Sequence, residues 1–143
     1  MTTRRAHVRW EGNLSEGQGE VDFGQGAFSA PYSFASRFDE GDGTNPEELL
    51  SAAHASCFAM SLSHVLSEAG FKPDFFEVTA RVTISPQDGS FRISRSHLVC
   101  EAGIPGINAT TFAGHAENAR TNCPISKALA GTEITLESRL RAG

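Results

Sequence analysis

The chain has 143 residues, which is enough for one domain with a sizeable hydrophobic core. Hydrophobic residues make up 39% of the sequence and charged residues 20%, as in ordinary globular proteins. The formal net charge of −5 gives no basic surface for nucleic acid or an anionic membrane, so we expect neither partner. No apolar run follows the charged N-terminus, and no window approaches the ~20 apolar residues of a membrane helix. We therefore expect a cytoplasmic protein.

The first third of the chain predicts a meander of three short antiparallel strands. Residues 6–12 and 17–23 have the pattern of strands with a turn between them. Residues 27–38 scatter aromatic side chains among polar ones, which favours extended structure over helix. Residues 39–44 form a polar loop that leads into the next element.

Residues 44–70 predict one long helix whose start and stop are both encoded. Asn45 can cap the first turn, Pro46 suits the first helical position, and Glu48 completes a capping box. Gly70 is the expected left-handed stop. Apolar residues wrap most of the circumference, which indicates a buried helix.

The second half of the chain predicts a hairpin, two helical segments and a last strand. Residues 76–85 and 91–101 alternate as paired strands, and a shorter helix opens at residue 110 or 111 and ends near Asn122. Residues 125–131 add a helical turn or two, and residues 132–140 form the last strand. The order of elements predicts a single α+β domain over the whole chain (1–143), with one hydrophobic helix against a largely antiparallel sheet.

The long helix carries Cys57 and His54 one turn apart on one face. A buried cysteine packs as a small hydrophobe, and apolar burial raises the pKa of its thiol. For Cys57 to react, a cation must therefore reach it from elsewhere in the fold. His54 could be a base or a metal ligand, but a hydrogen-bonded histidine beside the core is the favoured interpretation.

The other two cysteines have different settings, and three cysteines are too few for a disulfide framework. Cys123 precedes Pro124 and so falls at a helix cap, where the amide dipoles favour a thiolate. On this basis alone Cys123 is the better nucleophile. The alternative is that Cys123 is only a weak N-cap without a chemical role. Cys100 shares a strand face with Leu98, and we expect it in the core.

A metal site could join His54 and Cys57 with His115 or Cys123. However, the sequence has no CxxC or HxxxH spacing, so zinc is not favoured. It also has no GxGxxG or GxxxxGK stretch for nucleotide phosphates. We expect no cofactor.

Two segments, TNPEELLSAAHASCFAMSLS (44–63) and NCPISKAL (122–129), together resemble the osmotically inducible protein C (OsmC) family of peroxidases. Its relatives are the organic hydroperoxide resistance (Ohr) proteins. Shorter matches extend over nearly the whole chain: WEG, YSFASRF, EAGF and PGI. The resemblance implies an α+β OsmC/Ohr-like fold, with antiparallel sheets packed around a long central hydrophobic helix. It also implies an intertwined homodimer with active sites at its interface, and a role against oxidative stress.

The resemblance also implies the site residues. Cys57 matches the family's peroxidatic cysteine and Cys123 the resolving one, which reverses the ranking above. Arg37 and Glu47 match the family's arginine and glutamate, and an arginine just before the long helix resembles the OsmC branch. Arg37 would lower the pKa of Cys57 with its positive charge, and Glu47 would pair with Arg37 to hold its orientation.

The implied reaction is a thiol-dependent reduction of organic hydroperoxides and hydrogen peroxide. The Cys57 thiolate attacks the distal peroxide oxygen and becomes a sulfenic acid, which Cys123 condenses to a Cys57–Cys123 disulfide. An external dithiol of lipoyl or thioredoxin type must reopen that bond. Two alternatives remain: a redox-sensing or binding protein of the same fold without turnover, and a structural metal-binding domain.

Helix geometry adds one expectation about assembly. Glu47 and Cys57 are ten residues apart, so in a straight helix they lie ~15 Å apart along the axis. A relay through Arg37 hardly spans that distance within one subunit. Two such helices packed antiparallel would bring Glu47 near the partner's Cys57, which agrees with a homodimer.

Overall fold

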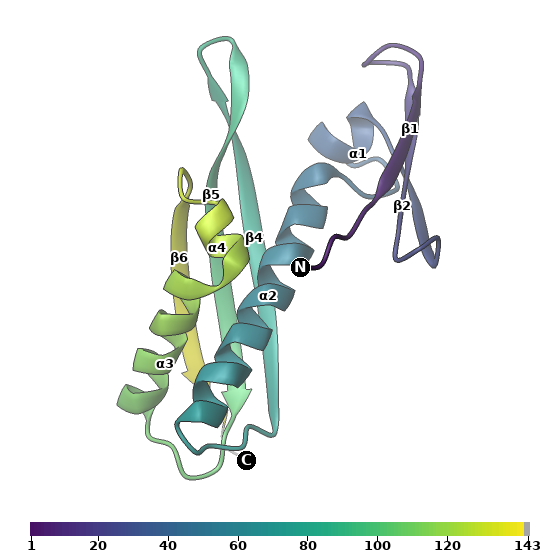
Figure 1. Ribbon diagram of the computed structural model, residues 1–143. Helices are drawn as coiled ribbons and strands as arrows, with labels where there is room; N and C mark the ends of the chain where they lie inside the picture. Colours follow the sequence, from purple (N-terminus) through teal and green to yellow (C-terminus); the bar gives the residue numbers. More distant parts are fainter. Residues whose placement is uncertain (142–143) are drawn as a thin grey trace. The chain divides into compact units, whose positions relative to one another are not determined.

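The computed structural model describes residues 1–141, and the chain divides into two compact units, Met1–Leu49 and Leu50–Gly143. The elements follow one another in an α+β order, as predicted (Figure 1). They are β1 (His7–Glu11), β2 (Gln18–Phe23), β3 (Phe28–Tyr32), α1 (Phe34–Phe38), α2 (Pro46–Glu68), β4 (Phe75–Gln87), β5 (Ser90–Gly103), α3 (Ala109–Asn122), α4 (Pro124–Ala128) and β6 (Glu133–Leu140). The single domain over 1–143 stays a prediction, and its last two positions (142–143) lie outside the described residues.

The first unit contains the predicted three-stranded meander. β1 pairs with β2 and β2 with β3, both antiparallel. Gly19 sits on the central strand between two aromatic rings, Trp10 and Tyr32, whose centroids are 5.4 Å apart. A Cβ at Gly19 would lie 2.4 Å from the Tyr32 ring, so a side chain there would push the rings apart.

Residues 34–38 form the short helix α1, so the prediction of extended structure through residue 38 was wrong. Ser33 caps this helix: its hydroxyl accepts the N–H of Ser36 at 3.2 Å. Ser36 returns the contact, because its hydroxyl accepts the N–H of Ser33 at 2.8 Å. This reciprocal cap satisfies backbone N–H groups at the start of the helix. The spacing of the aromatic residues, on which the prediction rested, gives no sign of such a cap. Arg37 is therefore a helical residue.

The predicted start and stop of α2 are both present. The side chain of Asn45 accepts the N–H of Glu48 at 2.8 Å, as a cap does. The Glu48 carboxylate, however, accepts the Thr44 hydroxyl at 3.0 Å, which replaces the back-contact to Asn45 that a capping box would make. At the other end Gly70 has φ 87° and the N–H of Phe71 reaches back to the Leu66 carbonyl at 2.9 Å, so the left-handed stop is confirmed.

In the second unit α2 and α3 cover one face of the sheet β4–β5–β6 (Figure 1). The buried residues of α2 recur every fourth position, which aligns them along one side of the helix. The core consists mainly of His54, Phe58, Leu62 and Leu66 from α2, Leu98, Cys100 and Ala102 from β5, and Phe112, Ala116 and Ala119 from α3. Cys100 lies in the core, as predicted.

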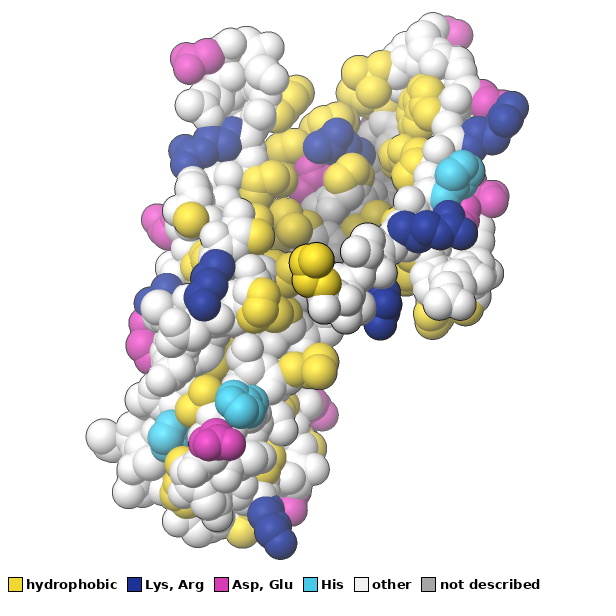
Figure 2. All heavy atoms as spheres, viewed as in Figure 1, with side chains coloured by type: hydrophobic (Ala, Val, Ile, Leu, Met, Phe, Trp, Pro, Cys, Tyr) yellow, Lys and Arg dark blue, Asp and Glu magenta, His cyan; other side chains and the backbone are white. Residues whose placement is uncertain are grey.

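The opposite side of α2 is exposed in the single chain. Ala52, Ser56, Met60 and His64 recur along it, and Met60 is 77% exposed. The expectation of a helix buried all round therefore holds for one side only. Figure 2 shows further hydrophobic side chains at the surface. Phe28 in the first unit and Phe91 in the second are among the exposed large hydrophobic residues.

By length and composition, α2 is also able to span a membrane, contrary to the expectation that no segment approaches that limit. It has 23 residues and a mean hydropathy of 1.3 over its most apolar window. The core helix of a water-soluble protein meets the same criterion. In this chain one side of α2 packs on the sheet through Phe58, Leu62 and Leu66.

The strand β6 lies parallel to β5, whereas the other three strand pairs are antiparallel. The predicted antiparallel arrangement is thus largely confirmed, with one parallel pair. The cause is the connection: α3 and α4 carry the chain back along the sheet before β6 begins.

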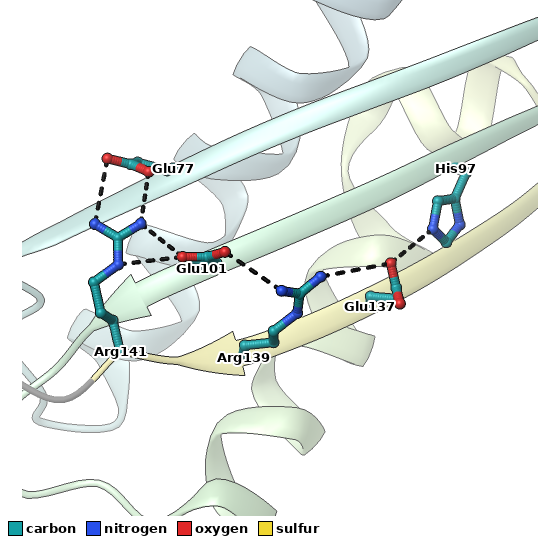
Figure 3. Close-up of polar contacts among 6 residues, drawn as sticks. All are labelled: Glu77, His97, Glu101, Glu137, Arg139 and Arg141. Carbon is teal, nitrogen blue, oxygen red and sulfur yellow. Dashed lines mark hydrogen bonds and ion pairs between the residues drawn. The ribbon is translucent and has the colours of Figure 1, made fainter.

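A ladder of ion pairs runs across the other face of this sheet (Figure 3). Its members are Glu77, His97, Glu101, Glu137, Arg139 and Arg141. Arg141, next to the end of β6, reaches Glu77 on β4 at 2.7 Å and Glu101 on β5 at 2.6 Å. The Arg141 guanidinium holds the pKa of Glu77 below its usual range. The ladder joins all three strands, although exposed pairs of this kind stabilise only modestly.

Candidate active site

The second unit brings Cys57 and Cys123 together. Cys57 lies in the middle of α2, and Cys123 lies between α3 and α4. Their side chains hydrogen-bond to each other, and both thiols are free. Contact between two thiols is the arrangement from which a disulfide between them can form.

The surroundings of Cys57 do not favour its thiolate. Burial raises the pKa of the Cys57 thiol above its ordinary value. The backbone N–H of Ile125 donates a hydrogen bond to the sulfur and lowers the pKa, but contact with Cys123 raises it again. The net direction is upward. This agrees with the expectation that Cys57 needs a cation before it can react.

Cys123 caps α4, as the sequence predicted. Pro124 occupies the start of this five-residue helix, and the Cys123 sulfur accepts the N–H of Ser126 at 3.3 Å. The Ser126 hydroxyl lies 3.0 Å from the same sulfur. The N–H groups of Ile125 and Ser126 thus serve the two sulfurs from consecutive positions in the chain.

His54 is fully buried and hydrogen-bonded on both ring nitrogens. Its Nδ1 lies 2.6 Å from the Ser96 hydroxyl and its Nε2 lies 2.8 Å from the Ser126 hydroxyl. Burial lowers the pKa of His54, so the ring is neutral at pH 7. The interpretation as a hydrogen-bonded histidine beside the core is confirmed.

The structure does not assemble the metal site considered above. His115 packs edge-on against Phe71, with ring centroids 6.2 Å apart. Among residues 1–141, no three His, Cys, Asp or Glu side chains are grouped so that they could hold an ion.

Arg37 and Glu47 form an ion pair within the first unit. Nη2 of Arg37 lies 2.9 Å from one Glu47 oxygen, and its Nε lies 3.0 and 3.2 Å from the two oxygens. Glu47 is 8% exposed, and the guanidinium also lies over the Phe38 ring at 5.2 Å. Two-point contact with a nearly buried carboxylate fixes the plane of the guanidinium. The predicted pairing is confirmed.

Sequence reasoning missed three contributors: Ser126, Ser96 and the Ile125 amide. Ser126 could have been found from the sequence, because it lies three residues after the cap Cys123. A cap side chain accepts the backbone N–H at that position, which brings the residue there next to the cap. Ser96 is 42 residues from His54 and lies in a strand with no local signal. Only the packing of α2 on β5 brings the two together.

The chain as a whole is similar to known proteins. Residues 39–138 match the family described as OsmC-like protein. The chain is 42% identical over 140 residues to the peroxiredoxin OsmC of Escherichia coli, covering 97% of each chain. It is 33% identical over 98 residues to the organic hydroperoxide resistance protein OhrB of Bacillus subtilis, covering 66% of this chain and 69% of the relative.

Solved structures agree with the fold. The crystal structure of OhrB from Bacillus subtilis superposes with a TM-score of 0.75 at 27% identity, covering 94% of this chain and 97% of that one. An OsmC-like protein of unknown function from Vibrio cholerae superposes with a TM-score of 0.76 at 17% identity, covering 96% and 99%. The second likeness concerns the fold alone.

Proposed function

The chain belongs to the OsmC family, and from that premise we propose that it is a thiol-dependent peroxidase of organic hydroperoxides and hydrogen peroxide. The observation that carries the proposal is the contact between the thiols of Cys57 and Cys123. The names of its relatives support a redox function directed at hydroperoxides.

In the proposed reaction Cys57 attacks as its thiolate. Its sulfur takes the distal oxygen of ROOH, the O–O bond breaks, and the alkoxide leaves with a proton as alcohol. Cys57 is then a sulfenic acid. The Cys123 sulfur attacks it and releases water, which gives a Cys57–Cys123 disulfide. An external dithiol of lipoyl or thioredoxin type returns both thiols to the reduced state.

Arg37 is the proposed source of the cation that Cys57 lacks within its own unit. A fixed guanidinium near the sulfur would lower the pKa of the thiol, opposing the effect of burial. The Glu47 carboxylate keeps the guanidinium plane in one orientation through its two-point contact. In these roles Arg37 activates Cys57, and Glu47 positions Arg37.

We propose that the active form is a homodimer in which Arg37 and Glu47 serve the partner's Cys57. The exposed side of α2, with Met60 at 77% exposure, supports a second copy that covers it.

The free thiols of all three cysteines fit a reducing compartment such as the cytoplasm.

The decisive experiment oxidises the reduced protein with one equivalent of cumene hydroperoxide without reductant. Intact mass should fall by two hydrogen atoms, and peptide mapping should locate the new bond between Cys57 and Cys123. Cys123→Ser should instead give a sulfenic acid on Cys57 that dimedone traps, and Cys57→Ser should not be oxidised. Two untouched thiols in the unmodified protein would refute the proposal. Repeated turnover with a dithiol separates a peroxidase from a redox sensor.

Sharing of the site across chains has its own test. Cys57→Ser and Glu47→Ala subunits should each be inactive alone, and the mixed dimer should regain one complete site. Activity no higher than that of the separate parents would contradict sharing between chains, while leaving the peroxidase chemistry intact.

A further inference from the structure

A chain of hydrogen bonds runs from the Cys123 sulfur into the core of the second unit. Cys123 contacts the Ser126 hydroxyl at 3.0 Å, Ser126 contacts His54 Nε2 at 2.8 Å, and His54 Nδ1 contacts the Ser96 hydroxyl at 2.6 Å. Ser126 is 5% exposed and the other three are fully buried. A polar chain inside an apolar core is costly to desolvate, so its continuity from a reactive sulfur to a titratable ring points to a role.

This series of hydrogen bonds can carry a proton from Cys123 towards His54. A neutral imidazole has one donor and one acceptor nitrogen, and each serine hydroxyl both donates and accepts. With Nδ1–H donating to Ser96, Nε2 accepts the Ser126 hydroxyl, which in turn accepts the Cys123 S–H. Burial is the only cause that shifts the pKa of His54, and it keeps the ring neutral with this acceptor available.

We propose that Ser126 and His54 form a proton path for Cys123, through which the resolving thiol gives up its proton as it attacks oxidised Cys57. The inference rests on the proposed function, because it concerns the step in which Cys123 resolves the Cys57 sulfenic acid. Ser126 touches the reacting sulfur and is a catalytic residue of this step. His54 acts through Ser126 and is a positioning residue that also holds the proton.

The step balances as follows. The proton of Cys123 moves to the Ser126 oxygen while the Ser126 proton moves to His54 Nε2. The Cys123 electron pair forms the S–S bond and the S–O bond of the Cys57 sulfenic acid breaks. The departing hydroxide takes a proton from solvent, and the imidazolium returns one to solvent. One thiol and one sulfenic acid thus give one disulfide and one water.

The contacts of Ser126 favour the thiolate while it exists. Its N–H and its hydroxyl both reach the Cys123 sulfur, at 3.3 and 3.0 Å, so two donors can serve the negative charge. Ser126 also lines a surface pocket together with Arg120 of α3 and Lys127 of α4, which offers the proton a way to solvent. The titratable groups that face this proton path are Cys57 on α2, which contacts Cys123, and Arg120 and Lys127, which line the pocket beside Ser126.

The test follows the resolving step by itself in Ser126→Ala and His54→Gln. Reduced protein is mixed with one equivalent of hydroperoxide and quenched at intervals, and mass spectrometry counts the Cys57 sulfenic acid, as its dimedone adduct, and the disulfide. The sulfenic acid should form within about twofold of the wild-type rate. At pH 7 the disulfide should form ~10²-fold more slowly, which is the lower range for loss of general base catalysis.

The pH profile distinguishes a proton path from a packing role. As the pH rises from 6 to 9, hydroxide that enters through the surface pocket lined by Ser126 can take over the role of the missing base, so the variants should approach the wild-type rate of disulfide formation. A packing defect would slow this step by the same factor at every pH. Arg120 and Lys127 are present in all the proteins compared, so their influence cancels in the ratio of rates.

Two controls keep the result interpretable. Ser126→Thr keeps the hydroxyl and should restore most of the rate, and this pair of Ser126 variants decides the matter if His54→Gln does not fold. Ser85→Ala removes a serine–serine hydrogen bond of 2.7 Å on the β4–β5 hairpin and should change nothing. Wild-type resolution in Ser126→Ala, or slowing by a constant factor across pH, would overturn the path alone. If no sulfenic acid forms on Cys57 even in Cys123→Ser, the peroxidase proposal fails and the path with it.

Discussion

Cys100 should resist alkylation in the folded protein by about three orders of magnitude. The perturbation is Cys57→Ser with Cys123→Ser, which leaves Cys100 as the single thiol of the chain. Its side chain is fully buried, and burial, with a smaller effect of Glu101, raises the pKa of the thiol to about 12. At pH 8 a thiol of pKa ~12 is ~10⁻⁴ ionised, against ~10⁻¹ for a pKa of ~9, and only the thiolate reacts.

The assay compares the same variant folded and unfolded. Iodoacetamide is added at pH 8, and intact mass records the fraction of alkylated protein over time, with and without urea. Unfolding should raise the rate about 10³-fold from ionisation alone, and steric shielding adds to this factor. A folded rate within tenfold of the unfolded one would refute the reasoning from burial. Cys100 would then have to be considered as a third redox thiol.

Three further predictions concern stability and the first unit. Leu66→Ala, at a fully buried position, should lower the free energy of unfolding by ~2–5 kcal/mol in urea titrations, whereas Leu14→Ala, at a 64% exposed position, should change it by less than ~0.5 kcal/mol. Because the pKa of Cys100 is higher in the folded state, the stability it contributes is present below pH ~9 and is lost as the pH rises towards ~12; at pH 10 the protein should lose ~1.4 kcal/mol relative to its Cys100→Ala variant. Gly43→Ala, with φ 112° and a backbone oxygen 2.2 Å from the new Cβ, should disturb the loop before Glu47 and reduce peroxidase activity, whereas Gly26→Ala, with open space around it, should not.

Those elements that depend on short-range signals could be predicted from the sequence. The cap at Asn45 and the stop at Gly70 mark α2 within two residues of its observed ends, because both signals act on neighbouring backbone groups. The segment at residues 34–38 was mispredicted because another local signal, the helix cap formed by Ser33, outweighed the aromatic pattern that favoured extended structure. The parallel pairing of β6 follows from the path of α3 and α4, which strand alternation does not report.

The candidate site divides in the same way. The motifs around Cys57 and Cys123 identified both thiols, and those around Arg37 and Glu47 identified an ion pair that the structure contains. The partners of His54 could not be anticipated, because Ser96 and Ser126 lie 42 and 72 residues away along the chain.

For this protein the sequence by itself determined the family, most elements of the fold and the two candidate thiols, since these depend on local spacing and residue type. The tertiary structure decided how those thiols are surrounded. Packing of α2 against β5 and α4 partly buries Cys57 and connects Cys123 through Ser126 to His54. The reactivity of a thiol depends on burial and on nearby hydrogen-bond donors, and both are properties of residues distant in the chain.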